Sequence, residues 1–296
     1  MTNNEFRNSS APTLRHSKHP GFGLLSSLGT WVFRHSLFLL PSLLAASPLT
    51  PKLSPEVIDA MAKVHKGFDG QRTYVAQFGD SITYSMAFWS PMGWSDPSPY
   101  LTEDDGLPKT PANGRKWKNV INGAGAKGPK HANYSGWRIG NLLKVADDVL
   151  ARDKPEAVII MVGTNDISGG KVPENYRKGL EELIQKCLDV HCVPILNTIP
   201  PRRGRDEAVD ACNAIIRDVA KQKKLPLADF HAACLEVRPG NSWDGTIISK
   251  DGVHPSGGKT HLYTPENLKQ SGYALRNWVN FQVFRQLHFK VFETTD

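Results

Sequence analysis

Short apolar runs alternate with longer amphipathic segments from residue 73 onward, and this alternation constrains the fold more than any other feature of the sequence. The run at 157–162 (AVIIMV) is continuous and rich in β-branched residues, as expected for a strand buried on both faces. Further strands are predicted at 74–78, 117–121, 193–197 and 226–230. Amphipathic helices are predicted at 139–152, 174–190, 205–224 and 267–287. Strands that alternate with single helices indicate an α/β domain whose parallel sheet is covered on both faces.

The chain divides into three parts on this pattern. Residues 1–46 are predicted to be a signal peptide or N-terminal leader, and residues 47–72 an N-terminal extension with a short helix at 55–66. Residues 73–290 are predicted to form the main domain. Within it, residues 84–116 are rich in Pro, Gly and Trp and break the alternation. We therefore expect a long irregular insertion, a kind of segment that often carries function in compact domains.

The composition of the first 46 residues is typical of a secretory signal peptide. Four basic residues stand against one acidic residue, and a short apolar run at 36–46 ends in small side chains. The run is shorter than the ~20 residues that usually span a membrane. We expect export to the periplasm or the extracellular space, with no stable membrane span after processing. A leader that is not cleaved would instead leave the protein anchored to the membrane.

Charge and cysteine content exclude some classes of partner. The formal net charge is +7, but no cluster of Lys and Arg interleaves with aromatic residues as in a nucleic-acid groove, so no nucleic-acid partner is expected. The four cysteines include no C-x-x-C pair, which argues against a zinc site. They are interpreted as structural thiols, and export leaves one disulfide open.

Two polar motifs come directly after predicted strands. Ser81, in the G-D-S of 79–81, follows the first strand, where its hydroxyl would face the crevice in which α/β sheets bind ligands. Its alternative interpretation is an N-cap of the next helix. Asn165, in the G-T-N-D of 163–166, follows the strongest strand, and its amide can donate to a developing oxyanion. The alternative for Asn165 is an Asx-turn.

A third motif, D-G-V-H-P at 251–255, lies just before the last long helix. Histidine is the usual general base near neutral pH, and a carboxylate can fix its tautomer and stabilise the imidazolium. With two residues between them, Asp251 and His254 can share one loop. Alone, such a motif is more often a turn with a surface histidine.

The blocks FGDSIT at 78–83, GTND at 163–166 and DGVHP at 251–255 together resemble the SGNH (GDSL-like) hydrolase family, in the family's order and over roughly residues 73–286. The resemblance implies a three-layer, flavodoxin-like α/β sandwich with a central parallel sheet of about five strands. It also implies a serine esterase that uses no metal and no organic cofactor. In it Ser81 is the nucleophile, His254 the base, and Asp251 the residue that orients His254.

The same resemblance implies an oxyanion hole formed by the N–H of Ser81, the side chain of Asn165 and a backbone N–H from a glycine. The stretch HANYSGWRIG at 131–140 is similar to the H-x-G-x-S-G-W-x-I form of carbohydrate-esterase branches of the family. It also leads straight into a predicted helix. We therefore predict Gly136 as the second backbone donor, with Gly128 as the alternative.

Export, the S-G-W block and the aromatic insertion favour an O-acetyl group on a carbohydrate as the substrate, whether a small molecule or a polysaccharide. Aromatic rings are typical surfaces for sugar rings, although each is also explained by ordinary packing. The candidates for this role are Trp89, Trp94, Trp137 and Trp243. Arg202 is the candidate partner for an anionic group on the substrate.

Two alternatives to a carbohydrate deacetylase stay open. One is a lipid or general short-chain esterase with the same site, which a contiguous apolar channel for the acyl chain would favour. The other is a non-catalytic carbohydrate-binding protein on the same fold. The presence of Ser81, Asn165, Asp251 and His254 together counts against this second alternative, because binding alone does not need all four.

Overall fold

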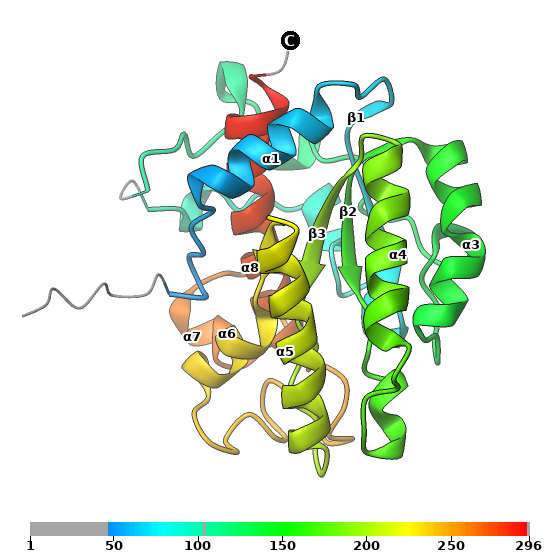
Figure 1. Cartoon of the computed structure of the whole chain (residues 1–296). Coiled ribbons are helices and arrows are strands. Elements are labelled where there is room, and N and C mark those ends of the chain that lie inside the picture. Colours follow the sequence, from blue (N-terminus) through cyan, green and yellow to red (C-terminus); the bar gives the residue numbers. More distant parts are fainter. Residues whose placement is uncertain (1–46, 103–104, 295–296) are drawn as a thin grey trace, which may run out of the picture. The chain divides into compact units, whose positions relative to one another are not determined.

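The computed structural model describes residues 47–102 and 105–294, so the predicted leader at 1–46 lies outside the described residues. In the described part, four parallel strands form one sheet in the order β1-β2-β3-β4 (Figure 1). The strands are β1 (Gln71–Gly79), β2 (Pro155–Met161), β3 (Val193–Asn197) and β4 (Leu227–Ala228). Every residue of β2 and β3 is buried, which explains why both strands are apolar except for Glu156 and Asn197.

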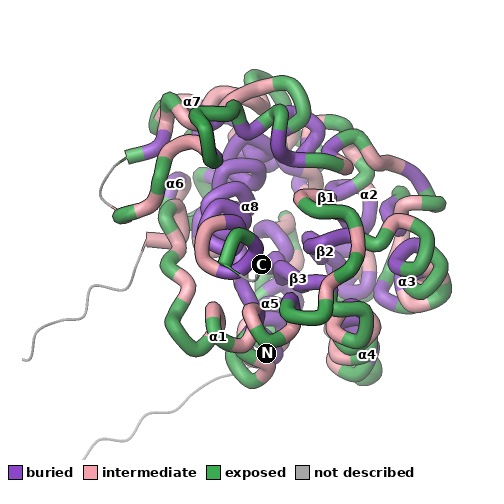
Figure 2. The backbone as a smooth tube through the Cα atoms, turned by 90° about the horizontal axis from the view of Figure 1, so that it is seen from above, coloured by how far each residue is buried: buried purple, intermediate pink, exposed green. Residues whose placement is uncertain are grey.

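Helices cover both faces of this sheet, which confirms the predicted α/β sandwich. The connecting helices are α3 (Ile139–Asp153), α4 (Tyr176–Asp189) and α5 (Asp206–Gln222). Because crossovers between parallel strands are right-handed and the strands follow in chain order, these three helices lie on the same face. Helix α8 (Gly272–Leu287) lies on the opposite face (Figures 1 and 2).

Helix α8 is buried around its whole circumference. All sixteen of its residues are buried, because the sheet lies on one side and the irregular segment after β1 covers the other (Figure 2). In that covering layer the Trp89 ring meets Phe284 edge-on at 6.0 Å between centroids, and the Trp117 ring meets Phe281 at 5.1 Å. The insertion thus completes the hydrophobic core.

The sheet has four strands rather than about five, because the prediction of a strand at 117–121 is wrong. This segment begins with the 3₁₀ helix η4 (Trp117–Asn119), and its apolar side chains pack inward. Asn122, just beyond it, makes a single isolated parallel bridge to Tyr74 of β1. The segment therefore runs beside the free edge of β1 without extending the sheet.

The predicted last helix is two helices, α7 (Pro265–Leu268) and α8, because the side chain of Ser271 accepts the N–H of Ala274 and starts a new one. The remaining α-helices are α1 (Pro55–His65), α2 (Ser81–Tyr84) and α6 (Phe230–Val237). Short 3₁₀ helices are η1 (Ser90–Gly93), η2 (Ser98–Tyr100), η3 (Ala112–Gly114), η4, η5 (Pro129–His131) and η6 (Asp166–Gly169), and η7 (His288–Phe292) is a π-helical turn.

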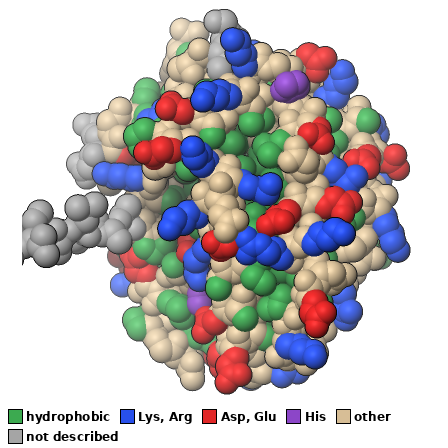
Figure 3. All heavy atoms as spheres, viewed as in Figure 1, with side chains coloured by type: hydrophobic (Ala, Val, Ile, Leu, Met, Phe, Trp, Pro, Cys, Tyr) green, Lys and Arg blue, Asp and Glu red, His purple; other side chains and the backbone are tan. Residues whose placement is uncertain are grey.

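Three further observations concern the surface and the thiols. No helix in the described residues has the length and apolarity to cross a membrane. Basic and acidic side chains are interspersed on the face that carries α1, α4 and α5 (Figure 3). All four cysteines, Cys187, Cys192, Cys212 and Cys234, are buried free thiols.

Candidate active site

Ser81 occupies the first turn of α2, immediately after β1. Asp80, not Ser81, caps this helix, because its Oδ1 accepts the N–H of Ile82 at 2.9 Å. A Cβ on Gly79 would lie 2.4 Å from the carbonyl oxygen of Met161, so only glycine lets the chain turn here against β2. The Ser81 hydroxyl is thus free of a capping role at the carboxyl end of the central strands.

A chain of two hydrogen bonds joins Ser81, His254 and Asp251. The Oγ of Ser81 lies 2.8 Å from Nε2 of His254, and Nδ1 of His254 lies 2.7 Å from Oδ2 of Asp251. Because Nδ1 faces a carboxylate, it carries the proton and leaves Nε2 as the acceptor for the serine hydroxyl. Residues 173 positions apart in the sequence therefore meet as a serine nucleophile and its base require.

Asp251 is held in its ionised form. Burial alone would raise its pKa, but the backbone N–H groups of His254 and Val253 and the hydroxyl of Ser249 lower that pKa far below its usual value. All three donate to Oδ1 at 2.7–3.0 Å, which leaves Oδ2 for the imidazole. The loop thus supplies a fixed carboxylate that can stabilise an imidazolium.

The two glycine candidates for the oxyanion hole differ in one hydrogen bond. The N–H of Gly128 donates to Oδ1 of Asn133 at 2.9 Å and is therefore engaged. The N–H groups of Gly136 and Ser81 make no hydrogen bond within the described residues. This difference favours Gly136 over Gly128 as the second backbone donor.

Asn165 lies against the same turn as Gly136. Its Nδ2 donates to the carbonyl oxygen of Trp137 at 3.1 Å, which uses one of its two N–H groups and leaves the other. The turn is attached to the strand that carries the nucleophile, since the N–H of Tyr134 donates to the carbonyl oxygen of Gly79 at 3.3 Å. The three predicted donors therefore come from neighbouring, hydrogen-bonded segments.

Asp166, next to Asn165, accepts a hydrogen bond at the start of α3. Its Oδ1 accepts the N–H of Ile139 at 3.2 Å and so satisfies a donor at the start of α3. Burial raises the pKa of Asp166, and it raises the pKa of the fully buried Asp80 to about 6. Within residues 47–102 and 105–294, no group of three or more His, Cys, Asp or Glu side chains is arranged to hold a metal ion.

Two basic side chains, which sequence reasoning missed, donate hydrogen bonds to residues of α2. Arg276 of α8 donates to the carbonyl oxygen of Ile82 and to Oγ1 of Thr83, both at 3.0 Å. Lys127 donates to the carbonyl oxygens of Thr83 (2.7 Å) and Phe88 (3.0 Å). Neither cation has a carboxylate partner in the described residues, and burial lowers the pKa of Arg276 to about 9 and that of Lys127 to about 6.

The predicted sugar-binding tryptophans fall into two groups. Trp89 and Trp243 are buried in the core, so the prediction that they offer ring faces to a substrate is wrong. Trp137 is half-buried beside Gly136. Trp94 is 54% exposed and its ring lies 4.9 Å from that of His261.

Two tyrosines extend the surface of Trp137 across the site. The ring of Tyr134 lies 6.2 Å from that of Trp137 and 5.2 Å from that of Tyr84, which stands on α2 with Ser81. Both tyrosines are exposed. We call Tyr84, Tyr134 and Trp137 the aromatic row. Sequence reasoning missed the tyrosines, although Tyr134 directly precedes the S-G-W block.

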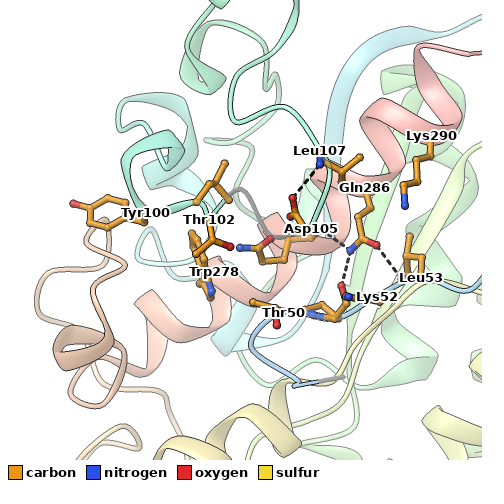
Figure 4. A pocket seen from close by; sticks show the side chains of 13 residues that line it. Thr50, Lys52, Leu53, Tyr100, Thr102, Asp105, Leu107, Trp278, Gln286 and Lys290 are labelled. Carbon is orange, nitrogen blue, oxygen red and sulfur yellow. Dashed lines mark hydrogen bonds between the residues drawn. The ribbon is translucent and has the colours of Figure 1, made fainter. Parts of the chain in front are cut away.

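Four of the better-defined cavities in the described part have volumes of about 200–470 Å³, and none of these four is lined by Ser81, His254 or Asn165. Figure 4 shows one of them, which Tyr100, Trp278 and the segment from Thr50 to Leu53 surround. In it, Gln286 accepts the N–H of Leu53 at 2.9 Å and donates to the carbonyl oxygen of Pro51 at 2.6 Å. Gln286 therefore attaches the N-terminal segment to α8.

Residues 78–257, which include every residue of the Ser81–His254–Asp251 chain, match the profile of the GDSL-like Lipase/Acylhydrolase family. The chain belongs to this family. The predicted resemblance to SGNH hydrolases is thereby confirmed.

Other GDSL-like and esterase proteins are similar over most of the domain. A multidomain esterase from Ruminococcus flavefaciens is 28% identical over 218 residues, which are 62% of this chain and 26% of that protein. The chain thus spans about a quarter of that relative. The structure of the psychrotrophic esterase EstA from Pseudoalteromonas sp. is 14% identical, with 73% of this chain and 99% of that chain covered and a TM-score of 0.48. The structure of a carbohydrate esterase family 3 protein from Talaromyces cellulolyticus is 18% identical, with 75% and 99% covered and a TM-score of 0.47.

Proposed function

We propose that this GDSL-like hydrolase cleaves an O-acetyl ester of a carbohydrate with Ser81 as the nucleophile. The observation that carries the proposal is the chain from Ser81 Oγ to His254 Nε2 (2.8 Å) and from His254 Nδ1 to Asp251 (2.7 Å). It gives the hydroxyl a base within proton-transfer distance and gives that base a fixed counter-charge.

The proposed reaction moves one proton along the hydrogen bonds that join Ser81, His254 and Asp251. Nε2 of His254 takes the hydroxyl proton as Ser81 attacks the ester carbonyl, and Asp251 stabilises the imidazolium that results. The N–H groups of Ser81 and Gly136 and the free Nδ2–H of Asn165 hold the negative oxygen. His254 then returns the proton to the departing alcohol, and a water molecule, deprotonated by the same imidazole, releases acetate from Ser81.

Two features favour a short acyl group on a sugar. None of the four cavities described above is lined by Ser81, so none of these four is the channel that a long acyl chain would need at the nucleophile. The aromatic row exposes Tyr84 and Tyr134 beside the oxyanion donors, and such rings pack against the apolar faces of sugars. Together these features favour a carbohydrate deacetylase over a lipid esterase.

The proposed function includes export directed by the predicted leader at residues 1–46. A substrate such as an acetylated polysaccharide is met outside the cytoplasm, where a signal peptide at residues 1–46 would direct the enzyme. Secretion of a fusion of residues 1–46 to a reporter enzyme would support export, and retention of the reporter in the cytoplasm would contradict it.

The test of the mechanism is turnover of a chromogenic acetyl ester by the wild type and by Ser81→Ala. The variant is expected to be folded and to lose activity by about 10³-fold or more, because the nucleophile is absent. Ser242→Ala is the matched control, since Ser242 is exposed and donates only to the carbonyl oxygen of Pro239. Undiminished turnover in Ser81→Ala contradicts the mechanism.

The test of the substrate is release of acetate from acetylated polysaccharides, with long-chain 4-nitrophenyl esters run beside them. Faster release from the polysaccharides supports the deacetylase, and preference for the long-chain esters supports a lipid esterase. Tight polysaccharide binding without turnover of any ester supports the non-catalytic alternative.

A further inference from the structure

Three arginines from two separate segments contact the loop that carries Asn165. Nη2 of Arg138 lies 3.4 Å from Oγ of Ser168, and Nε of Arg205 donates to the carbonyl oxygen of Ser168 at 3.3 Å. Arg202 donates to the carbonyl oxygen of Thr164. The three guanidinium groups therefore surround residues 164–168, on either side of the proposed oxyanion donor.

None of these arginines is paired with a carboxylate in the described part of the chain. Arg203, next to them, holds Asp244 through two contacts of 2.7 Å. The chain thus supplies a counter-ion for one arginine of this turn and leaves its neighbours without one. Burial and the charge of Arg205 lower the pKa of Arg202, and the charge of Asp80 opposes part of this lowering.

Asp80 interacts electrostatically with Arg202, and Asp166 with Arg138, but neither carboxylate forms an ion pair with these arginines. Asp80 and Asp166 are buried, and each directs its Oδ1 at a backbone N–H, of Ile82 and Ile139 respectively. A guanidinium group has five N–H donors, and these three arginines use only a few of theirs on the loop. Arg138 is exposed and Arg202 and Arg205 are half-exposed, so the other donors can reach a ligand.

The segments that carry these arginines are connected to Asn165 and to the loop of His254. Arg138 directly follows Trp137, whose carbonyl oxygen accepts from Asn165. The turn that carries Arg202 and Arg205 is attached to the loop of His254, because the N–H of Arg203 donates to the carbonyl oxygen of Gly252 at 2.9 Å. An anion bound among these arginines would lie beside an ester placed at Ser81.

We infer that the substrate carries a carboxylate near the scissile ester, and that Arg138, Arg202 and Arg205 bind it. This inference rests on the ester hydrolysis proposed above and adds that the sugar is anionic, as in a uronic acid. Arginine suits this task because its planar fork matches a carboxylate in two parallel hydrogen bonds. An acetyl group has no charge, so the anion belongs to the sugar rather than to the acyl group.

The test compares two forms of one polymer, acetylated polygalacturonate with free carboxylates and the same material with its carboxylates methyl-esterified. The wild type is expected to have a kcat/KM for acetate release about tenfold or more higher on the free-carboxylate form, since charge-assisted hydrogen bonds are lost on the other. Arg205→Gln and Arg202→Gln are each expected to lower this ratio about tenfold. Arg177→Gln, on α4 and paired with Glu181 and Asp218, is the control that keeps the ratio.

A second measurement uses only the wild type, so it tests the inference even if the arginine variants fail to fold. In the wild type, added NaCl is expected to lower kcat/KM for the free-carboxylate form more than for the esterified form, because salt screens exposed charges. Equal rates on both forms, at every salt concentration, overturn the inference while ester hydrolysis stands. Failure to hydrolyse any acetyl ester, including the chromogenic one, identifies the proposed function itself as the error.

Discussion

The side-chain oxygen of Asn133 accepts the backbone N–H of Gly128 at 2.9 Å. The amide nitrogen of the same side chain donates to the carbonyl oxygen of Gln77 in β1 at 2.8 Å. Asn133 therefore fixes the glycine-rich segment after β1 to the strand that leads to Ser81. The first of these bonds engages the N–H of Gly128, which is why Gly136, three residues after Asn133, is the glycine donor in the proposed oxyanion hole.

Asn165→Ala is expected to lower kcat on a chromogenic acetyl ester by about 10²–10³-fold, because one of three oxyanion donors is lost. KM is expected to change little, since the bond strengthens as charge develops on the oxygen. Asn175→Ala, at an exposed asparagine without a side-chain capping bond, is the matched control. A rise in KM with kcat unchanged would contradict the oxyanion role of Asn165.

Asp80→Asn is expected to change how stability depends on pH. The pKa of Asp80 in the folded protein, raised to about 6 by burial, lies above the unfolded value of 3.8. Between these values the folded protein holds a proton that the unfolded chain has lost, so the free energy of unfolding falls as pH rises through this window. Asn keeps the oxygen that accepts from Ile82 and does not titrate.

Urea unfolding of the wild type and of Asp80→Asn, at several pH values from about 4 to about 7, measures this contribution. The variant is expected to gain stability relative to the wild type as pH rises. Asp59→Asn, at an exposed position of α1, controls for the general loss of an acidic group. A difference that is constant over the pH range would show that Asp80 does not titrate there.

Arg276→Met is expected to destabilise the protein by about 3 kcal/mol or more, since two charge-assisted hydrogen bonds are lost and their acceptors stay buried. These acceptors belong to Ile82 and Thr83 of the helix that carries Ser81, so kcat of the folded fraction is also expected to fall. Arg276→Lys keeps the charge and is expected to recover part of both losses. Urea unfolding and kcat on the chromogenic ester measure the two effects; an unchanged kcat in folded Arg276→Met would limit Arg276 to a structural role.

Tyr134→Ala is expected to raise KM for an acetylated polysaccharide several-fold, because the middle ring of the aromatic row is removed. A small chromogenic acetyl ester does not span the row, so its KM is expected to change less. Tyr134→Phe keeps the ring and is expected to behave as the wild type. Equal changes for the two substrates in Tyr134→Ala would place Tyr134 outside the sugar-binding surface.

The strands buried on both faces could be predicted because nearly all of their residues are apolar. The segment at 117–121 has the same local character but packs against α8, so its apolar residues indicate burial and not a strand. Two of the four tryptophan candidates, Trp89 and Trp243, failed for the same reason, since both are buried and Trp89 packs beside Phe284. Periodicity and residue type indicate that a side chain is buried. Which residues it packs against depends on the tertiary fold.

The motif residues of the site could be predicted because each follows a strand or shares a short loop. Lys127 and Arg276 could not, because a basic side chain whose hydrogen-bond acceptors lie on distant segments leaves no pattern in the sequence. Arg138 and Arg205 were missed because their partners lie on another loop. Arg202 was a candidate because it follows a predicted strand, and its role stays a prediction.

Helix α8 also sets the order in which the enzyme can be completed during synthesis. The hydrogen bond from Arg276 to the carbonyl oxygen of Ile82 spans 194 residues, so the ribosome releases the nucleophile long before its support. Until α8 has been synthesised, the apolar surfaces of the sheet and of the irregular segment after β1, which pack on α8 in the fold, are exposed and can bind chaperones. The contact between Arg276 and α2 can therefore form only after α8 has been synthesised.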